Sequence, residues 1–81
     1  MEGKGMELRH IRYFKAIAEE KNFTRAAEKL AIAQPPLSRQ IQDLEKELGA
    51  PLFIRTPHKV ALTEEGELFL QYASQILDLV S

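Results

Sequence analysis

Residues 23–49 read FTRAAEKLAIAQPPLSRQIQDLEKELG, and this stretch predicts two helices joined by a short turn. Thr24 is the expected N-cap of the first helix, since its hydroxyl can accept an otherwise unpaired backbone N–H. Residues 31–33 are the expected turn, and the second helix should begin at Gln34. Two prolines follow in its first turn, where an N–H would lack a helical partner anyway. Gly49 can then end this helix in a left-handed conformation.

The second predicted helix has two different faces. Its apolar residues recur at helical spacing and should face a core; they are Leu37, Ile41, Leu44 and Leu48. The opposite face carries Ser38, Arg39, Gln42 and Lys46, with Gln34 and Pro35 at its N-terminal tip. Arginine can pair with the two major-groove acceptors of guanine, and glutamine with the donor and acceptor of adenine. On composition alone, an ordinary solvated helix face explains these residues equally well.

This stretch closely resembles the helix-turn-helix of LysR-type transcriptional regulators, in the form FTRAAEKLxIAQPPLSRQIQxLExELG. The resemblance continues upstream through residues 6–14, MELRHIRYF, and downstream through residues 52–55, LFIR, and 62–66, LTEEG. It therefore covers nearly all of residues 6–81. So long an ordered match favours a DNA-contacting face over an ordinary solvated one. The variant IAQPPLSRQIQ looks most like regulators of aromatic-compound degradation.

The resemblance implies a mainly α fold, namely a winged helix-turn-helix with a three-helix core and a two-stranded wing. Residues 6–62 would form this DNA-binding domain, and residues 63–81 a long C-terminal linker and dimerisation helix. Relatives commonly begin at the methionine equivalent to Met6, so residues 1–5 are expected to be a mobile native extension or a cloning remnant. Full-length relatives continue into an effector-sensing domain. The sequence is thus expected to be the DNA-binding portion alone, with no cofactor of its own.

The resemblance also implies which residues contact DNA. The second helix would lie in the major groove, and the residues expected near the bases are Gln34, Pro35, Pro36, Ser38, Arg39 and Gln42. Thr24, Arg25 and Lys59 would contact phosphates, which position the domain without reading sequence. The wing would carry Arg55, His58 and Lys59. Relatives often have arginine where His58 stands, and histidine replaces arginine poorly at neutral pH, so His58 is expected to be an exposed loop residue.

Three further elements are predicted around the central stretch. Residues 8–20 read as a helix with Leu8, Ile11, Phe14, Ile17 and Ala18 on one face, and Phe23 should fill the core between this helix and the next. Residues 52–55 and 59–62 read as two short strands of a hairpin. A lone hairpin is marginal in water, so its apolar residues Leu52, Phe53, Val60 and Leu62 should pack against the helices. Thr63 can cap the last helix.

The last predicted helix is apolar around most of its circumference. Its polar residues between positions 68 and 80 are Gln71, Ser74, Gln75 and Asp78, which form one narrow stripe. A domain of this size can cover only one side of such a helix, and an uncovered apolar patch marks an interface. We therefore predict an isologous, antiparallel homodimer through Phe69, Tyr72, Ala73, Ile76, Leu77 and Val80. The alternative is a helix that packs only on its own domain.

The charges are distributed unevenly along the chain. The formal net charge is −1, and the 11 lysines and arginines all precede residue 60. Residues 61–81 contain only acidic charges, at Glu64, Glu65, Glu67 and Asp78. A nucleic-acid-binding domain needs a basic patch rather than a basic total. The pattern fits a basic body that faces DNA and an acidic C-terminal helix that is turned away from phosphates.

The composition also excludes several kinds of site. The 81 residues contain no cysteine and two histidines, which leaves no disulfide, no thiol catalysis and no cysteine-based zinc site. An enzyme is disfavoured because the sequence lacks a nucleophile–base pair and a glycine-rich phosphate loop. No apolar run is long enough to cross a bilayer and no signal-peptide pattern opens the chain, so we expect a cytoplasmic protein without a membrane partner.

Two function classes remain. The first is sequence-specific binding of double-stranded DNA as a dimer, at an interrupted inverted repeat, by a regulator whose small-molecule effector binds in a domain absent here. The second is a winged-helix scaffold for protein interactions, which would not require an exposed Arg39 and Gln42 beside Ser38 and Gln34.

Overall fold

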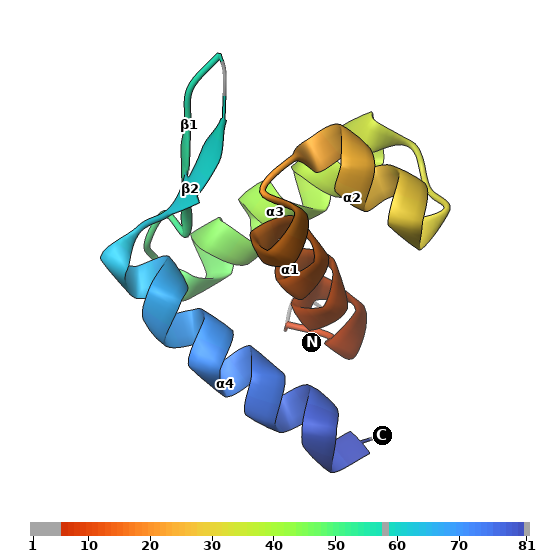
Figure 1. Cartoon of the computed structure of the whole chain (residues 1–81). Coiled ribbons are helices and arrows are strands. Elements are labelled where there is room, and N and C mark those ends of the chain that lie inside the picture. Colours follow the sequence, from red (N-terminus) through yellow and green to blue (C-terminus); the bar gives the residue numbers. More distant parts are fainter. Residues whose placement is uncertain (1–5, 58, 81) are drawn as a thin grey trace.

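The structure is a computed structural model that describes residues 6–57 and 59–80, which form four helices and one two-stranded sheet (Figure 1). In chain order the elements are α1 (Leu8–Glu20), α2 (Phe23–Leu30), α3 (Gln34–Leu48), β1 (Phe53–Arg55), β2 (Val60–Leu62) and α4 (Glu64–Val80). The predicted winged helix-turn-helix followed by a long helix is confirmed. Residues 1–5, expected to be an extension, lie outside the described residues, as do His58 and Ser81.

The cap of α2 differs from the prediction. Asn22 is the N-cap, and its Oδ1 accepts a hydrogen bond from the backbone N–H of Arg25 at 2.8 Å. The prediction of Thr24 as the cap is wrong because Thr24 already lies inside the first turn. Asn22 stands three residues before Arg25, which is the spacing at which a side-chain oxygen reaches a free N–H at a helix start.

The predicted turn and the bounds of α3 are confirmed. Ala31 adopts a left-handed conformation with φ 60°, and the backbone N–H of Ile32 donates to the carbonyl of Ala27 at 3.0 Å, which closes α2. α3 begins at Gln34 with both prolines in its first turn. It ends at Gly49, whose φ of 76° is left-handed and therefore suits glycine.

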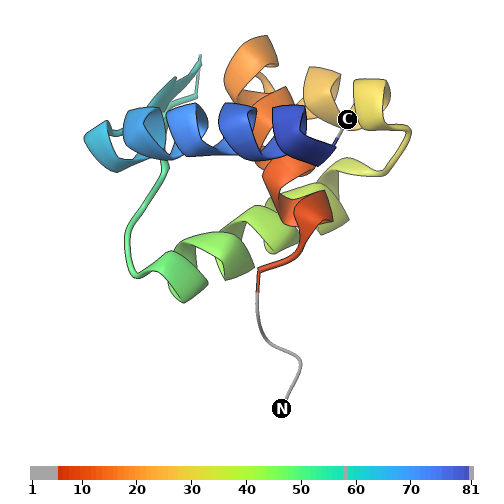
Figure 2. The ribbon, with the colours of Figure 1, turned by 90° about the horizontal axis from the view of Figure 1, so that it is seen from below.

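α1 lies between α3 and α4 and packs against both of them and against α2 (Figure 2). The largest fully buried side chains are Phe14, Ile17, Leu37, Ile41, Leu44 and Leu52. Phe14 is central, because its ring centroid lies 5.2 Å from that of Phe53 and 5.0 Å from that of Phe69. This one side chain joins α1 to the wing and to α4.

Two residues predicted to face the core are instead at the surface. The exposed fraction is 40% for Leu8 and 38% for Leu48. Leu8 is the first residue of α1 and Leu48 the last of α3. At these ends the neighbouring helices no longer cover the apolar stripe, although the helical period continues through them.

The wing is an antiparallel hairpin in which Phe53 pairs with Leu62 and Arg55 with Val60. Each strand is one residue shorter than predicted. Leu52 and Phe53 are buried, and Val60 and Leu62 pack against the core, so the predicted contact between hairpin and helices is confirmed.

Thr63 joins the wing to α4. Its hydroxyl donates to the carbonyl of Pro51 at 2.7 Å, and its backbone N–H donates to the carbonyl of Leu52 at 3.0 Å. The same hydroxyl accepts from the backbone N–H of Gly66 at 2.9 Å, which confirms Thr63 as the cap of α4. The two ends of the hairpin and the start of the long helix are therefore tied together at one point.

Gly66 is needed at this junction because there is no room for a side chain. A Cβ atom at this position would lie 2.1 Å from the carbonyl oxygen of Leu52, and that oxygen is backbone that cannot move aside cheaply. The first turn of α4 thus approaches the wing closely only because residue 66 is glycine.

We expect Gly66→Ala to lower the free energy of unfolding by about 1–3 kcal/mol, the usual effect of overpacking, although alanine is the better helix former. Urea denaturation would measure the change. Gly49→Ala is a comparison for backbone strain alone, because a Cβ there would meet nothing within 4 Å while its left-handed φ is unfavourable for alanine. A Gly66→Ala variant as stable as the parent would contradict the close approach.

Candidate nucleic-acid interface

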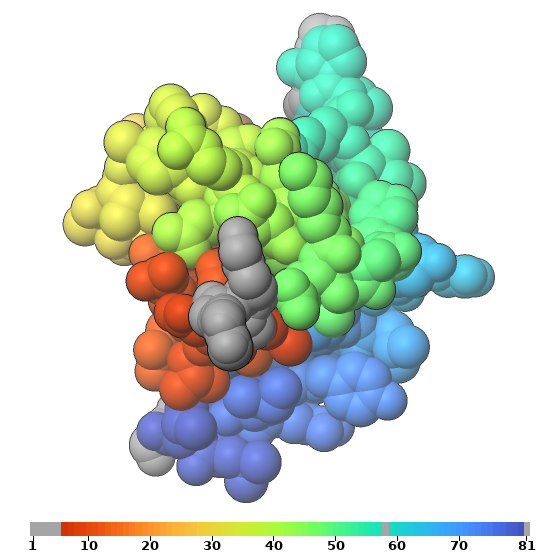
Figure 3. Space-filling model, turned by 180° about the vertical axis from the view of Figure 1, so that it is seen from behind, coloured from red at the N-terminus to blue at the C-terminus, as the bar shows by residue number. Residues whose placement is uncertain are grey.

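The outer face of α3 brings the predicted base-contacting residues together. Figure 3 shows α3 at the molecular surface with the wing projecting beside it. Pro35, Pro36, Arg39 and Gln42 are exposed, and Gln34 and Ser38 are half-buried. Arg39 forms no ion pair with any of the described residues. The face therefore offers a free guanidinium and amide groups to a partner.

The residues predicted to contact phosphates lie on two other elements. Thr24 and Arg25 are exposed in the first turn of α2. The side chain of Lys59 is also exposed, while its backbone is fixed: the Thr56 hydroxyl donates to the carbonyl of Lys59 at 3.0 Å and accepts from its N–H at 3.1 Å. His58, predicted to be an exposed loop residue of the wing, lies outside the described residues.

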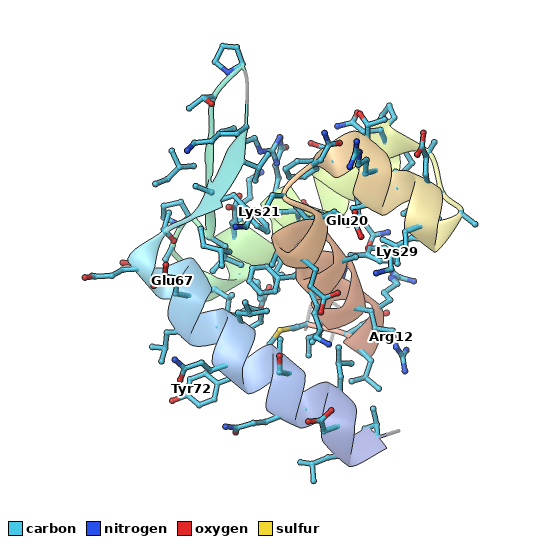
Figure 4. All side chains as sticks on the ribbon, in the orientation of Figure 1. Arg12, Glu20, Lys21, Lys29, Glu67 and Tyr72 are labelled. Atoms are coloured by element: carbon cyan, nitrogen blue, oxygen red, sulfur yellow. The ribbon has the colours of Figure 1, made fainter. Side chains whose placement is uncertain are left out.

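Some of the basic residues are already paired with acids. Lys29 Nζ lies 3.5 Å from an oxygen of Glu20 and 3.8 Å from one of Glu19, across the space between α2 and α1 (Figure 4). Lys15 also pairs with Glu19, and Arg9 pairs with Glu7. In the part of the chain that the structure describes, Arg25, Arg39 and Lys59 have no such acid. These three are therefore available to a polyanion, as are the exposed Arg12, Lys21 and Lys46, which also lack an ion pair with any described residue.

A carboxylate of α3 fixes the start of the wing. Glu45 Oε2 accepts hydrogen bonds from the backbone N–H groups of Leu52 at 2.7 Å and Phe53 at 3.2 Å. The position of the wing beside α3 therefore depends on one side chain of α3 itself. No sequence pattern indicated this role, because a glutamate near the end of an amphipathic helix looks the same whether it is solvated or bonded.

Arg55 also links the wing to the helices. Its guanidinium carbon lies 4.0 Å from the centroid of the Phe23 ring, and its Nη1 donates to Ser38 Oγ at 3.0 Å. The sequence indicated Arg55 as a wing residue and Ser38 as a base-contacting residue, but no pattern showed that the two side chains meet.

The exposed apolar residues of α4 differ from the predicted interface. Leu68, Tyr72 and Leu79 are exposed along one side of α4, and Tyr72 points away from the other helices (Figure 4). Of the predicted set, Tyr72 and Val80 are exposed, whereas Phe69, Ile76 and Leu77 pack partly against the core. Ala73 has no exposed surface, so placing it in an interface is a mistake: its small side chain lets α4 approach its own domain. Leu68 and Leu79 were left out of the predicted set.

Metal sites and membrane-spanning helices are absent from the described residues. They contain no group of three or more histidine, aspartate or glutamate side chains that could hold a metal ion. Among residues 6–57 and 59–80, no helix is both long and apolar enough to cross a membrane.

Comparison with known proteins identifies the family. Residues 8–67 match the model of the bacterial regulatory helix-turn-helix protein, lysR family. Since the match covers most of the chain, the chain belongs to this family. The predicted resemblance to LysR-type regulators is confirmed.

Relatives of known name are transcriptional regulators. The chain is 60% identical over 75 residues to the regulator BenM of Acinetobacter baylyi and 62% identical over 73 residues to the Hca operon transcriptional activator HcaR of Escherichia coli. These matches cover 93% and 90% of this chain but only 25% of each relative. The chain thus spans about a quarter of the length of these relatives.

Solved structures of family members have the same fold. The BenM DNA-binding domain bound to catB site 1 DNA superposes with a TM-score of 0.90 at 60% identity, covering 93% of this chain and 83% of that one. The CbnR DNA-binding domain in its DNA complex also gives 0.90, at 44% identity, with 93% and 86% covered. Full-length BenM gives 0.87 at 60% identity, with 93% of this chain and 25% of that chain covered.

Proposed function

We propose that this chain is the DNA-binding segment of a transcriptional regulator that binds double-stranded DNA sequence-specifically, as a homodimer, at an interrupted inverted repeat. The observation that carries the proposal is the outer face of α3, where Arg39 and Gln42 are exposed beside Gln34 and Ser38. The complexes of the BenM and CbnR domains with DNA support it, because they share this fold and much of this sequence.

In the proposed complex, α3 lies in the major groove with its N-terminal half against the base edges. Arg39 is assigned to a guanine and Gln42 to an adenine, the bases whose major-groove edges match their forked side chains. Gln34 and Ser38 form further polar contacts. Pro35 and Pro36 are exposed at the tip and supply apolar contact, for which a thymine methyl is suited.

Phosphate contacts flank this reading helix. Two elements beside α3 carry the exposed side chains that would make these contacts. They are the Thr24 hydroxyl and the Arg25 guanidinium at the start of α2, and the Lys59 ammonium in the wing. Such contacts set the register of the domain on the duplex but do not distinguish bases. They make binding fall steeply with salt concentration, because each neutralised phosphate releases counterions.

Dimerisation is assigned to the uncovered side of α4, around Leu68, Tyr72 and Leu79. Two copies of this side packed around a two-fold axis would cover both apolar patches at once. The dimer would present two copies of α3 to successive major grooves, which is why an inverted repeat is the expected target.

The remaining proposals concern the full-length protein of which this chain would be a segment. The variant IAQPPLSRQIQ supports a regulator of aromatic-compound degradation. We assign it to the cytoplasm and expect its small-molecule effector to bind in a domain outside this chain. For the present segment we propose no enzymatic activity and no cofactor. The competing function is a scaffold for protein interactions that does not bind DNA.

Arg39→Ala tests the function itself. Losing one bidentate base contact should cost about 1–3 kcal/mol on the preferred operator and relax the preference at one base position. Selection of bound sequences from a random DNA library, with the parent chain and the variant, would measure this. Uniform weakening on all sequences would make Arg39 a phosphate contact, and no binding by either protein would favour the scaffold.

Arg25 and Lys29 provide a matched pair of basic residues on α2. Arg25→Ala should reduce the slope of log affinity against log salt by about 0.9, the value for one phosphate contact. Lys29→Ala should leave the slope nearly unchanged, since Lys29 already pairs with Glu19 and Glu20. Gel-shift titrations at several salt concentrations would compare them. Equal slopes for the two variants would refute the assignment of Arg25.

Tyr72→Glu and Leu68→Glu should abolish the dimer while the domain stays folded, because both side chains are exposed in the single chain. The charged variants should sediment as monomers and lose most of their affinity for an operator with two half-sites. Ser74→Asp is the control, because it also adds one negative charge and helical spacing places it far around α4 from Leu68, Tyr72 and Leu79. A parent chain that sediments as a monomer at high micromolar concentration, with or without DNA, would disprove the dimer.

A further inference from the structure

Arg55 lies on the inner face of the wing. Side chains alternate along a strand, so Phe53 and Arg55 project from the face that meets the helices and Ile54 projects from the other face. Phe53 is buried there, whereas Arg55 stays exposed to solvent while it contacts the helices. From this inner face Arg55 contacts the Phe23 ring at 4.0 Å and Ser38 Oγ at 3.0 Å. One side chain of the wing thus touches the first residue of α2 and the outer face of α3.

The surface on which Arg55 rests is itself fixed by the core. Phe23 is buried, and its ring centroid lies 5.8 Å from that of Phe53 in an edge-to-face arrangement. A guanidinium is planar, so it can stack on an aromatic ring and still donate hydrogen bonds from its edge. A lysine ammonium has no such plane. The contact with Phe23 therefore aims the donating edge of Arg55 at Ser38.

This hydrogen bond determines whether the Ser38 hydroxyl acts as a donor or an acceptor toward a partner. A serine hydroxyl has one donor and two acceptor positions, and arginine has donors only. Ser38 Oγ must therefore accept from Arg55, which leaves its own hydrogen to be donated elsewhere. A cationic donor also polarises the hydroxyl and strengthens it as a donor. In the major groove its partners would be the acceptors N7 of purines, O6 of guanine and O4 of thymine.

We propose that Arg55 is a positioning residue that fixes Ser38 as a hydrogen-bond donor toward one base acceptor in the major groove, and that Arg55 itself does not contact DNA. This inference rests on the proposed function, since it needs α3 in the groove. It gives Arg55 a role inside the reading surface, where the sequence had indicated a residue of the wing alone.

A role for Arg55 as a phosphate contact is the competing explanation, and the two roles have different readouts. Removing a phosphate contact weakens all sequences alike and reduces the salt slope by about 0.9. Removing the hydrogen bond that orients Ser38 changes the base preference at one position of the DNA and leaves the salt slope unchanged. Lysine separates the two roles further, because it keeps the charge but loses the stacked fork.

The experiment selects bound sequences from a random duplex library with the whole 81-residue chain and four variants, and measures the salt slope of each. The variants are Arg55→Lys, Arg55→Gln, Ser38→Ala and the double variant Arg55→Lys/Ser38→Ala. We expect every variant to lose the same base preference by about 2- to 10-fold, the range for one net hydrogen bond. The double variant should lose no more than Ser38→Ala, and the salt slopes should not change.

Arg12→Gln is the matched control, since Arg12 is an exposed arginine on α1 that is assigned no DNA contact. It should leave both the base preference and the salt slope unchanged. Thermal unfolding of each variant checks that the fold is retained. A second measurement needs no variant: the parent chain should bind about 2- to 10-fold more weakly to a duplex whose base at that position is an analogue without the acceptor.

Each other outcome overturns a distinct claim. A lower salt slope with uniform weakening in Arg55→Gln would make Arg55 a phosphate contact. An unchanged base preference in Ser38→Ala, or full affinity for the analogue duplex, would show that Ser38 reads no acceptor, while the result for Arg39 could still uphold the proposed function. Absence of any base preference in the parent chain would instead refute the proposed function, and this inference with it.

Discussion

The packing of Phe14 is the contact on which the arrangement of the other elements depends. Its fully buried ring meets Phe53 of β1 at 5.2 Å and Phe69 of α4 at 5.0 Å. A two-stranded hairpin is marginal in water, and a single helix of this length gains most of its stability from packing. The wing and α4 are therefore stabilised by packing against α1. A chain of this size forms only one core, to which all three elements contribute.

Much of the fold could be predicted because the sequence marks its own boundaries. Both ends of α3 follow from the prolines in its first turn and from Gly49, and its buried face follows from the spacing of Leu37, Ile41 and Leu44. The outer face was predictable for the same reason, since a helix with one buried side fixes which residues face outward. Local rules were sufficient for these boundaries, although they placed the N-cap of α2 at Thr24 where the structure has Asn22.

Most other roles that the sequence did not indicate depend on contacts between residues that are distant in the chain. Glu45 and Arg55 reach partners 7 and 17 residues away, at Leu52 and Ser38, and no periodicity encodes such pairs. On α4, nearly every side is apolar, so the pattern could not indicate which side the domain's own core would take. Ala73 was assigned outward for that reason, and packing against α1 decided otherwise.

The carbonyl of Leu52 is the point at which the wing and α4 are mechanically connected. It accepts the N–H of Thr63 and lies against Gly66, so the base of the wing and the first turn of α4 meet at the same atom. Because the two elements are in direct contact there, movement of one displaces the other. A rotation of α4 about its axis would therefore press on the base of the wing directly, because no space separates the two elements at this atom.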